Sequence, residues 1–194
     1  MLGLKLETDP RWVDLVETDI SEILTDHAWC EQKAASNAIS IVVGWPEHGG
    51  LVEELIAIAR EELEHFGRVH TLILNRNLVL GRERKDHYVN QLLTFLKKDG
   101  NRDEKLADRL LFAAMIEARS CERFRVLSEH IKDSELASFY RELMESEAQH
   151  YTLFLRLANK YAPQDFNVDA RWKAWLDFEG SLIKNYGTKG RIHG

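Results

Sequence analysis

Only three prolines, at positions 10, 46 and 163, interrupt the 194 residues of the chain. The intervals between them are rich in Leu, Ala, Glu and Arg, and apolar residues recur in them at helical spacing. Proline stops a helix, whereas the residues of these intervals favour one, so the chain should form a few long helices. We therefore predict an all-α fold.

Capping residues, glycines and prolines mark the ends of the predicted helices. Asp9 and Pro10 suit the start of a short helix over 10–18, and two glycines precede a long helix that begins near residue 51. The four core helices are predicted at about 21–44, 51–77, 103–131 and 134–161, with a loop over 81–86, a shorter helix over 87–98 and a C-terminal helix at about 169–185. One side of the second core helix should be lined by Leu51, Leu55, Ile58, Leu63 and Phe66.

The composition is that of a globular protein, with 44% apolar residues and a net charge of −6. We predict a single domain over 1–194. The longest apolar stretches, such as 38–45, are far shorter than the ~20 residues that a membrane span needs, so we expect a cytoplasmic protein without membrane contact. Cys30 and Cys121 lie in no zinc-binding or disulfide spacing, which predicts two buried thiols.

One chemical pattern occurs twice. Glu31 precedes the Glu62-x-x-His65 motif by 31 residues, and Glu117 precedes Glu147-x-x-His150 by 30 residues. Positions i and i+3 of a helix share a face, so each Glu-x-x-His pair can direct an oxygen and a nitrogen at one point. Two half-helices and a short loop account for about 30 residues, which places each lone Glu on the hairpin partner of its motif.

This pattern is the ligand set of a two-metal carboxylate centre in a ferritin-like four-helix bundle. The 55 residues between Glu62 and Glu117 leave room for the one long crossover of that fold, with extra short helices. Two divalent cations balance four buried carboxylates, and an oxygen-rich site with one imidazole per metal suits iron or manganese. The predicted ligands are Glu31, Glu62, His65, Glu117, Glu147 and His150, with Glu62 and Glu147 bridging.

Other polar residues near the two motifs are not predicted to be metal ligands. His27 precedes Glu31 by one turn, and we expect it either just outside the metal site or at the surface. Four further glutamates should be solvated rather than ligating: Glu61, Glu64, Glu122 and Glu145. The alternative for the six ligands themselves is that they belong to exposed, charged helix faces.

Three segments resemble the MiaE-like tRNA hydroxylases over nearly the whole chain: Asp26-His-Ala-Trp-Cys-Glu-Gln-Lys-Ala-Ala35, Glu117-Ala-Arg-Ser-Cys-Glu-Arg-Phe124 and the Glu147-x-x-His150 helix. The resemblance implies two iron ions, dioxygen as co-substrate and an external electron donor such as a reductase. It implies hydroxylation of the isopentenyl group of 2-methylthio-N(6)-isopentenyladenosine at position 37, in the anticodon loop of tRNA. The ligands that it implies are the same six residues, and no catalytic residue beyond them is predicted.

Binding of tRNA to an acidic protein needs local cations. The candidates are Arg82, Arg84, Lys85, Lys97, Lys98, Arg102, Lys184, Lys189 and Arg191. Arg119 and Arg123 flank the Glu117 turn and should order the metal site or its mouth, with a buried salt bridge as the alternative. Trp29 stands where the family favours a small or polar residue, which affects packing or access and leaves the ligands intact.

Two other classes of protein fit the same residues. A ferritin-like iron-binding or ferroxidase protein uses nearly the same six ligands and needs no RNA substrate. A non-catalytic helical bundle would hold no iron. The sequence leaves the oligomeric state open.

Overall fold

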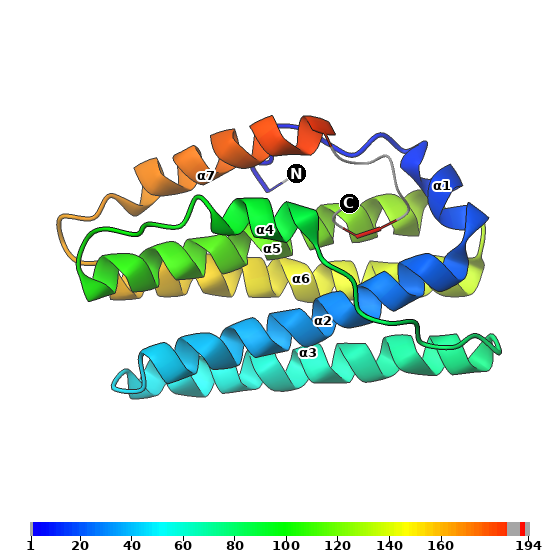
Figure 1. Cartoon of the computed structure of the whole chain (residues 1–194), viewed down its shortest axis with the longest axis horizontal. Helices are drawn as coiled ribbons and strands as arrows, with labels where there is room; N and C mark the ends of the chain where they lie inside the picture. Colours follow the sequence, from blue (N-terminus) through cyan, green and yellow to red (C-terminus); the bar gives the residue numbers. More distant parts are fainter. Residues whose placement is uncertain (1, 186–190, 193–194) are drawn as a thin grey trace. The chain divides into compact units, whose positions relative to one another are not determined.

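The computed structural model describes residues 2–185 and 191–192. Within these residues the protein is all-α, as predicted, with seven α-helices and one short 3-10 helix (Figure 1). The elements are α1 (Trp12–Thr18), α2 (Ile20–Gly44), α3 (Gly49–Asn75), α4 (His87–Leu93), α5 (Arg102–His130), α6 (Ser134–Tyr161), α7 (Val168–Leu182) and η1 (Ile183–Asn185). None of the described helices combines the length and the apolar character that crossing a membrane requires.

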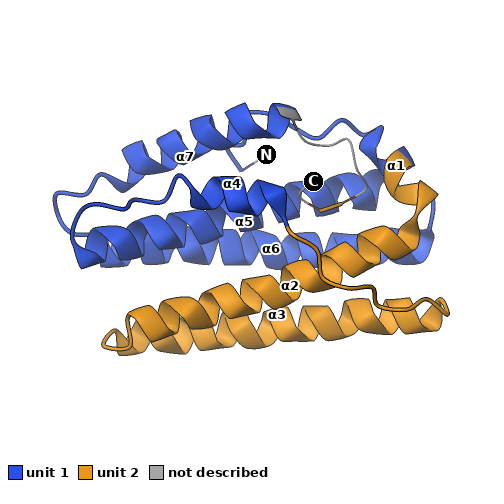
Figure 2. Ribbon diagram, in the orientation of Figure 1, with its two compact units in different colours: residues 1–14, 86–189, 193–194 blue, residues 15–85, 190–192 orange. Residues whose placement is uncertain are grey.

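The chain divides into two compact units (Figure 2). Unit 1 comprises residues 1–14, 86–189 and 193–194, and unit 2 comprises residues 15–85 and 190–192. Each unit contains one pair of the long predicted core helices, α5 with α6 in unit 1 and α2 with α3 in unit 2. The single domain over 1–194 stays a prediction.

In unit 2, the α2–α3 hairpin forms where the sequence supplies caps and a helix stop. Asp19 caps α2 by accepting a hydrogen bond from the backbone N–H of Glu22, and α2 ends at Gly44, two residues before Pro46. The buried positions of α3 follow helical spacing and include both predicted ligands: Leu51, Leu55, Ile58, Ala59, Glu62, His65, Val69, Leu72 and Ile73. The prediction that Leu63 joins this face is wrong, because Leu63 lies one residue off that register and is 55% exposed.

Unit 2 also contains an extended segment that runs along α2 (Figure 1). It comprises residues 78–85, and we call it the strap. The indole Nε1 of Trp29 donates a hydrogen bond to the carbonyl oxygen of Gly81 at 2.9 Å. The backbone N–H of Gly81 in turn donates to Thr25 Oγ1 at 3.2 Å, and Lys33 Nζ donates to the carbonyl oxygen of Arg84 at 3.0 Å. Trp29 therefore bears on local packing, as expected, by binding the strap to α2.

In unit 1, α5 and α6 pair along their length and α7 packs against α5. Asp108 of α5 is fully buried and holds α7: its carboxylate accepts hydrogen bonds from Arg171 Nε at 2.7 Å and from Trp175 Nε1 at 2.8 Å. The same carboxylate accepts the backbone N–H of Lys97 at 2.6 Å. The predicted helix over 87–98 is shorter than expected, because α4 ends at Leu93 and the chain then turns toward this bond.

Candidate metal centre

Unit 2 gathers one triad of predicted ligands. Glu31 comes from α2, and Glu62 and His65 come from adjacent turns of α3. Each residue is at most 4% exposed, and each offers one ligand atom within 4.8 Å of those of the other two. His65 Nδ1 lies 3.8 Å from Glu31 Oε2 and 3.7 Å from Glu62 Oε2. The spacing argument is thus confirmed for this hairpin, and the alternative of exposed helix faces is wrong for these residues.

The two carboxylates of this triad and the imidazole between them shift one another's pKa. Burial by itself raises the pKa of Glu31, but the charge and hydrogen bond of His27, with smaller contributions from His65 and Glu62, hold it well below its usual range. Burial lowers the pKa of His65, but the neighbouring Glu31 and Glu62 outweigh burial and raise it to about 10. In the absence of metal, the two carboxylates therefore favour the protonated form of His65.

Unit 1 gathers the second triad. Glu117 comes from α5, and Glu147 and His150 come from adjacent turns of α6. These three residues are also at most 4% exposed, with ligand atoms within 4.8 Å of one another. His150 Nδ1 lies 4.0 Å from Glu147 Oε2. Each triad therefore combines two buried carboxylates and one buried imidazole on one helical hairpin, with the same i, i+3 spacing.

The donors of the triads fit iron. All six are carboxylates or imidazoles, which suit iron or manganese. Cys121 is buried as predicted, and burial raises the pKa of its thiol to about 11, which keeps it protonated. Cys30 is only partly buried, contrary to our expectation.

Two residues near the ligands differ from what the sequence allowed us to predict. The placement of His27 was left open, and Glu122 was expected to be solvated. His27 is fully buried and its Nε2 bonds to Glu31 Oε1, so the surface alternative is wrong. Glu61, Glu64 and Glu145 are exposed as predicted. The prediction that Glu122 is solvated is wrong: it is fully buried, and its Oε2 accepts a hydrogen bond from Arg119 Nη1 at 2.9 Å.

Arg119 belongs to a buried ion-pair cluster on the side of α5 away from Glu117. Its Nη2 lies 2.7 Å from Glu179 Oε1 of α7, and Tyr88 of α4 donates to the same oxygen at 3.1 Å. The guanidinium of Arg123 lies 4.2 Å from the centre of the Trp12 ring. The salt-bridge alternative is therefore the right one for Arg119, which fastens α7 to α5. Neither Glu179 nor Tyr88 carried a sequence signal, because both partners are far from Arg119 in the chain.

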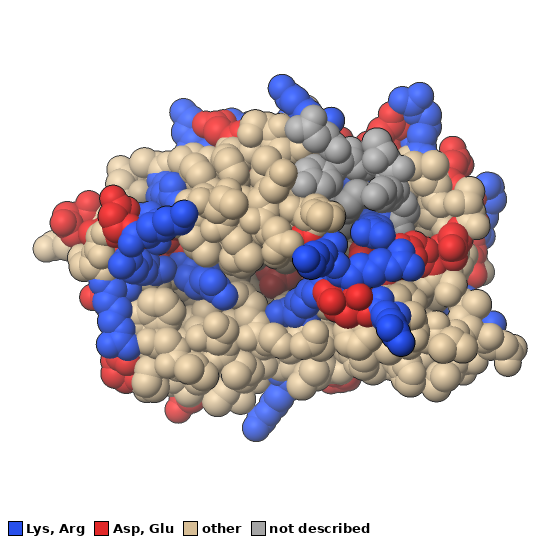
Figure 3. Space-filling model, viewed as in Figure 1, with Lys and Arg blue, Asp and Glu red and all other residues tan. Residues whose placement is uncertain are grey.

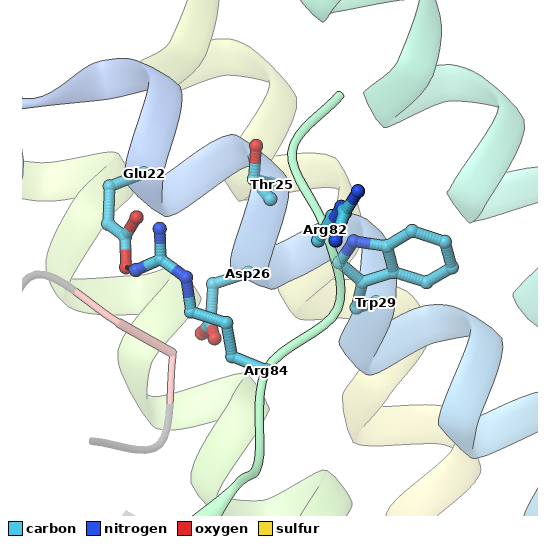
Figure 4. A pocket seen from close by; sticks show the side chains of 6 residues that line it. All are labelled: Glu22, Thr25, Asp26, Trp29, Arg82 and Arg84. Atoms are coloured by element: carbon cyan, nitrogen blue, oxygen red, sulfur yellow. Dashed lines mark hydrogen bonds and ion pairs between the residues drawn. The ribbon is translucent and has the colours of Figure 1, made fainter. Parts of the chain in front are cut away.

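A separate pocket lies between the strap and α2 (Figure 4). It is lined by Glu22, Thr25, Asp26, Trp29, Arg82 and Arg84. Arg84 points to the carboxylate of Glu22 and forms an ion pair with it, whereas Arg82 lies on the Trp29 side of the pocket (Figure 4). On the face shown in Figure 3, basic and acidic side chains are mixed where the strap runs along α2. The lining residues of α2 lie on the side of that helix opposite Glu31.

Two helical hairpins, each burying one Glu and one Glu-x-x-His motif, define the ferritin-like class of carboxylate metal proteins. Within this class, the chain belongs to the family described as tRNA-(MS[2]IO[6]A)-hydroxylase (MiaE), whose model matches residues 2–194.

Two curated relatives carry the name tRNA 2-(methylsulfanyl)-N(6)-isopentenyladenosine(37) hydroxylase. The protein of Pseudomonas putida is 38% identical over 157 residues, which cover 81% of this chain and 75% of that protein. The protein of Salmonella typhimurium is 32% identical over 143 residues, which cover 74% of this chain and 51% of that protein. The chain thus matches about half the length of the second relative.

Among solved structures, the chain is similar to protein 43 with aldehyde deformylating oxygenase activity from Synechococcus. The two are 33% identical with a TM-score of 0.90, and the match covers 99% of this chain and 96% of the other. The family resemblance and the ferritin-like, all-α fold predicted from the sequence are confirmed.

Proposed function

We propose that the two triads hold two iron ions, and that the protein is a dioxygen-dependent hydroxylase of the isopentenyl group of 2-methylthio-N(6)-isopentenyladenosine in tRNA. The match to the hydroxylase family over residues 2–194, with both triads intact and buried, carries this proposal. In it, the iron would be held by the carboxylates of Glu31, Glu62, Glu117 and Glu147 and by one imidazole nitrogen each from His65 and His150.

Buried apolar residues lie one turn from each ligand and give the centre its chemical environment. In unit 2 they include Ala28 and Ala35 around Glu31, and Ile58 before Glu62. In unit 1, Leu143 precedes Glu147 and Phe154 follows His150 by one turn. These side chains exclude water and suit an apolar prenyl chain.

The reaction needs more than the protein's own side chains can provide. When bound, the iron pair supplies the activation of dioxygen with two external electrons. The overall balance is one C–H bond, dioxygen, two electrons and two protons, giving one alcohol and water. The negative charges of the four carboxylates would balance the positive charges of the two metal ions. The ligand imidazoles would bind as neutral donors, so His65 must release its proton before metal binds. The electrons come from a partner reductase, and a tRNA substrate places the protein in the cytoplasm.

The contacts of the basic residues narrow the candidates for tRNA binding. Arg84 and Arg191 form ion pairs with Glu22, and Lys97 pairs with Glu104. Lys189 lies outside the described residues. Arg102 is exposed but already takes part in an interaction within the chain. Arg82 and Lys85 of the strap are exposed, as are Lys98 and Lys184, and we assign the phosphate contacts to these four.

The proposal is tested with purified protein loaded with Fe(II), a chemical or enzymatic reductant, dioxygen and tRNA that carries the prenylated nucleoside. Nucleoside analysis by mass spectrometry should show the gain of one oxygen atom on the prenylated adenosine. A Glu147→Ala variant, which lacks one proposed ligand, should give no product. Unchanged nucleoside in the presence of two bound irons and a competent reductant would refute the proposed activity.

A second candidate activity is oxygenation of an apolar aldehyde. The similarity to the Synechococcus protein, over 99% of this chain, favours this candidate, because that protein is named for aldehyde deformylating oxygenase activity. Long-chain aldehydes supplied to the same loaded protein would give a hydrocarbon without the formyl carbon if this activity is present. The ferroxidase alternative is not favoured, because the relatives described above are named as hydroxylases and an oxygenase.

A further inference from the structure

His27 is a buried histidine that the proposed ligand set does not use. It lies on α2 one helical turn before Glu31 and its side chain is fully buried. Its Nε2 is 2.5 Å from Glu31 Oε1, so one oxygen of that carboxylate is already engaged within α2. A buried imidazole at this distance is a hydrogen-bond donor to the carboxylate.

The two oxygens of Glu31 therefore have different surroundings. Oε1 faces His27, whereas Oε2 lies 3.8 Å from His65 Nδ1, on the side of the triad where the metal would bind. We propose that His27 is a positioning residue that makes Glu31 a ligand through Oε2 alone. This inference rests on the proposed metal centre and names a residue that controls one of its ligands.

A carboxylate can bind a metal in two ways, through one oxygen or through both, and rotation about its last carbon–carbon bond exchanges the two oxygens. A donor fixed on one oxygen removes the second way and holds the other oxygen in place before the metal arrives. Mutation of a residue that hydrogen-bonds to a metal ligand typically lowers the metal affinity by about 10–100-fold.

The second triad has no such donor at the matching position. The residue one turn before Glu117 on α5 is Ala113, whose methyl group cannot donate a hydrogen bond. Loss of the His27 donor should therefore affect the metal bound through Glu31 and spare the metal bound through Glu117. This asymmetry separates a positioning role from a general effect on folding.

The test uses the full-length protein, prepared without metal and titrated with Co(II), whose visible absorption reports on its ligands. His27→Leu removes the donor, and His27→Gln replaces it with an amide N–H. The matched control is His70→Leu, which removes a histidine of α3 that stacks on Phe66 and lies outside both triads. Thermal unfolding of the metal-free variants measures any purely structural effect.

In His27→Leu, we expect one of the two cobalt ions to bind about 10–100-fold more weakly with an altered absorption band, while the other binds as in the unchanged protein. His27→Gln should recover most of the affinity, and His70→Leu should match the unchanged protein. If His27→Leu does not fold, His27→Asn replaces it, because its amide ends too far from Oε1 to donate. Wild-type affinity and absorption for both ions in the donor-free variant would overturn the inference.

The experiments distinguish failure of the proposed role of His27 from failure of the proposed hydroxylase activity. Loss of cobalt affinity in His27→Leu without any tRNA hydroxylation by the unchanged protein would support the role of His27 and reject the activity. Hydroxylation by the unchanged protein with no effect of His27 on either cobalt ion would support the activity and reject the role of His27.

Discussion

Replacing Arg119 with methionine should cost the protein a large part of its stability. Arg119 is fully buried, and its guanidinium contacts Glu179 Oε1 at 2.7 Å, Glu122 Oε2 at 2.9 Å and the carbonyl oxygen of Leu6 at 3.1 Å. Methionine keeps most of the volume but leaves two buried carboxylates without their cation. Breaking a buried ion pair by removing one partner costs about 3–5 kcal/mol. A domain has a stability of about 5–15 kcal/mol, so the loss should be visible in chemical denaturation.

A second variant separates lost charge balance from lost packing. Adding Glu179→Gln to Arg119→Met removes one of the uncompensated carboxylates, so the double variant should recover part of the lost stability. A loss below about 1 kcal/mol for Arg119→Met at neutral pH would refute this account of the cluster.

Three further predictions concern the metal centre and its substrate. Glu147→Ala should lower the iron content below two ions per chain, measured by elemental analysis, while the α-helical circular dichroism is retained. Because the pKa of His65 is raised to about 10, a metal must displace its proton, so metal affinity should increase as the pH rises toward 10; affinity independent of pH in titrations would contradict this. Arg82→Ala and Lys85→Ala should each weaken tRNA binding and reduce the slope of log affinity against log salt by about 1, and an unchanged slope would exclude a phosphate contact.

The elements that could be predicted from the sequence are those set by local rules. Long proline-free intervals predicted the long helices to within two residues of their ends, for example 134–161 for α6. Each triad was also predictable, since the i, i+3 spacing and the distance of about 30 residues to the lone Glu follow from hairpin geometry. The joining of both triads in one centre stays a prediction.

The features that could not be predicted depend on partners far apart in the chain. Glu122 was expected to be solvated because the sequence does not show that Thr8, 114 residues earlier, donates its backbone N–H and its hydroxyl to the same carboxylate. Leu63 was placed inside by its apolar character, although the register set by Glu62 and His65 turns it to solvent. His27 had a usable signal, the i, i+4 spacing to Glu31, but that spacing alone does not separate a hydrogen-bond donor from a surface residue.

The strap has a consequence for RNA affinity. The segment that carries Arg82 and Lys85 is already held against α2 by the bonds of Trp29, Thr25 and Lys33. A loop that became ordered only when RNA arrived would lose about 1–2 kcal/mol per residue in backbone entropy. In this protein that ordering occurs during folding, so the proposed contacts of Arg82 and Lys85 with tRNA phosphates would carry little further cost in backbone entropy.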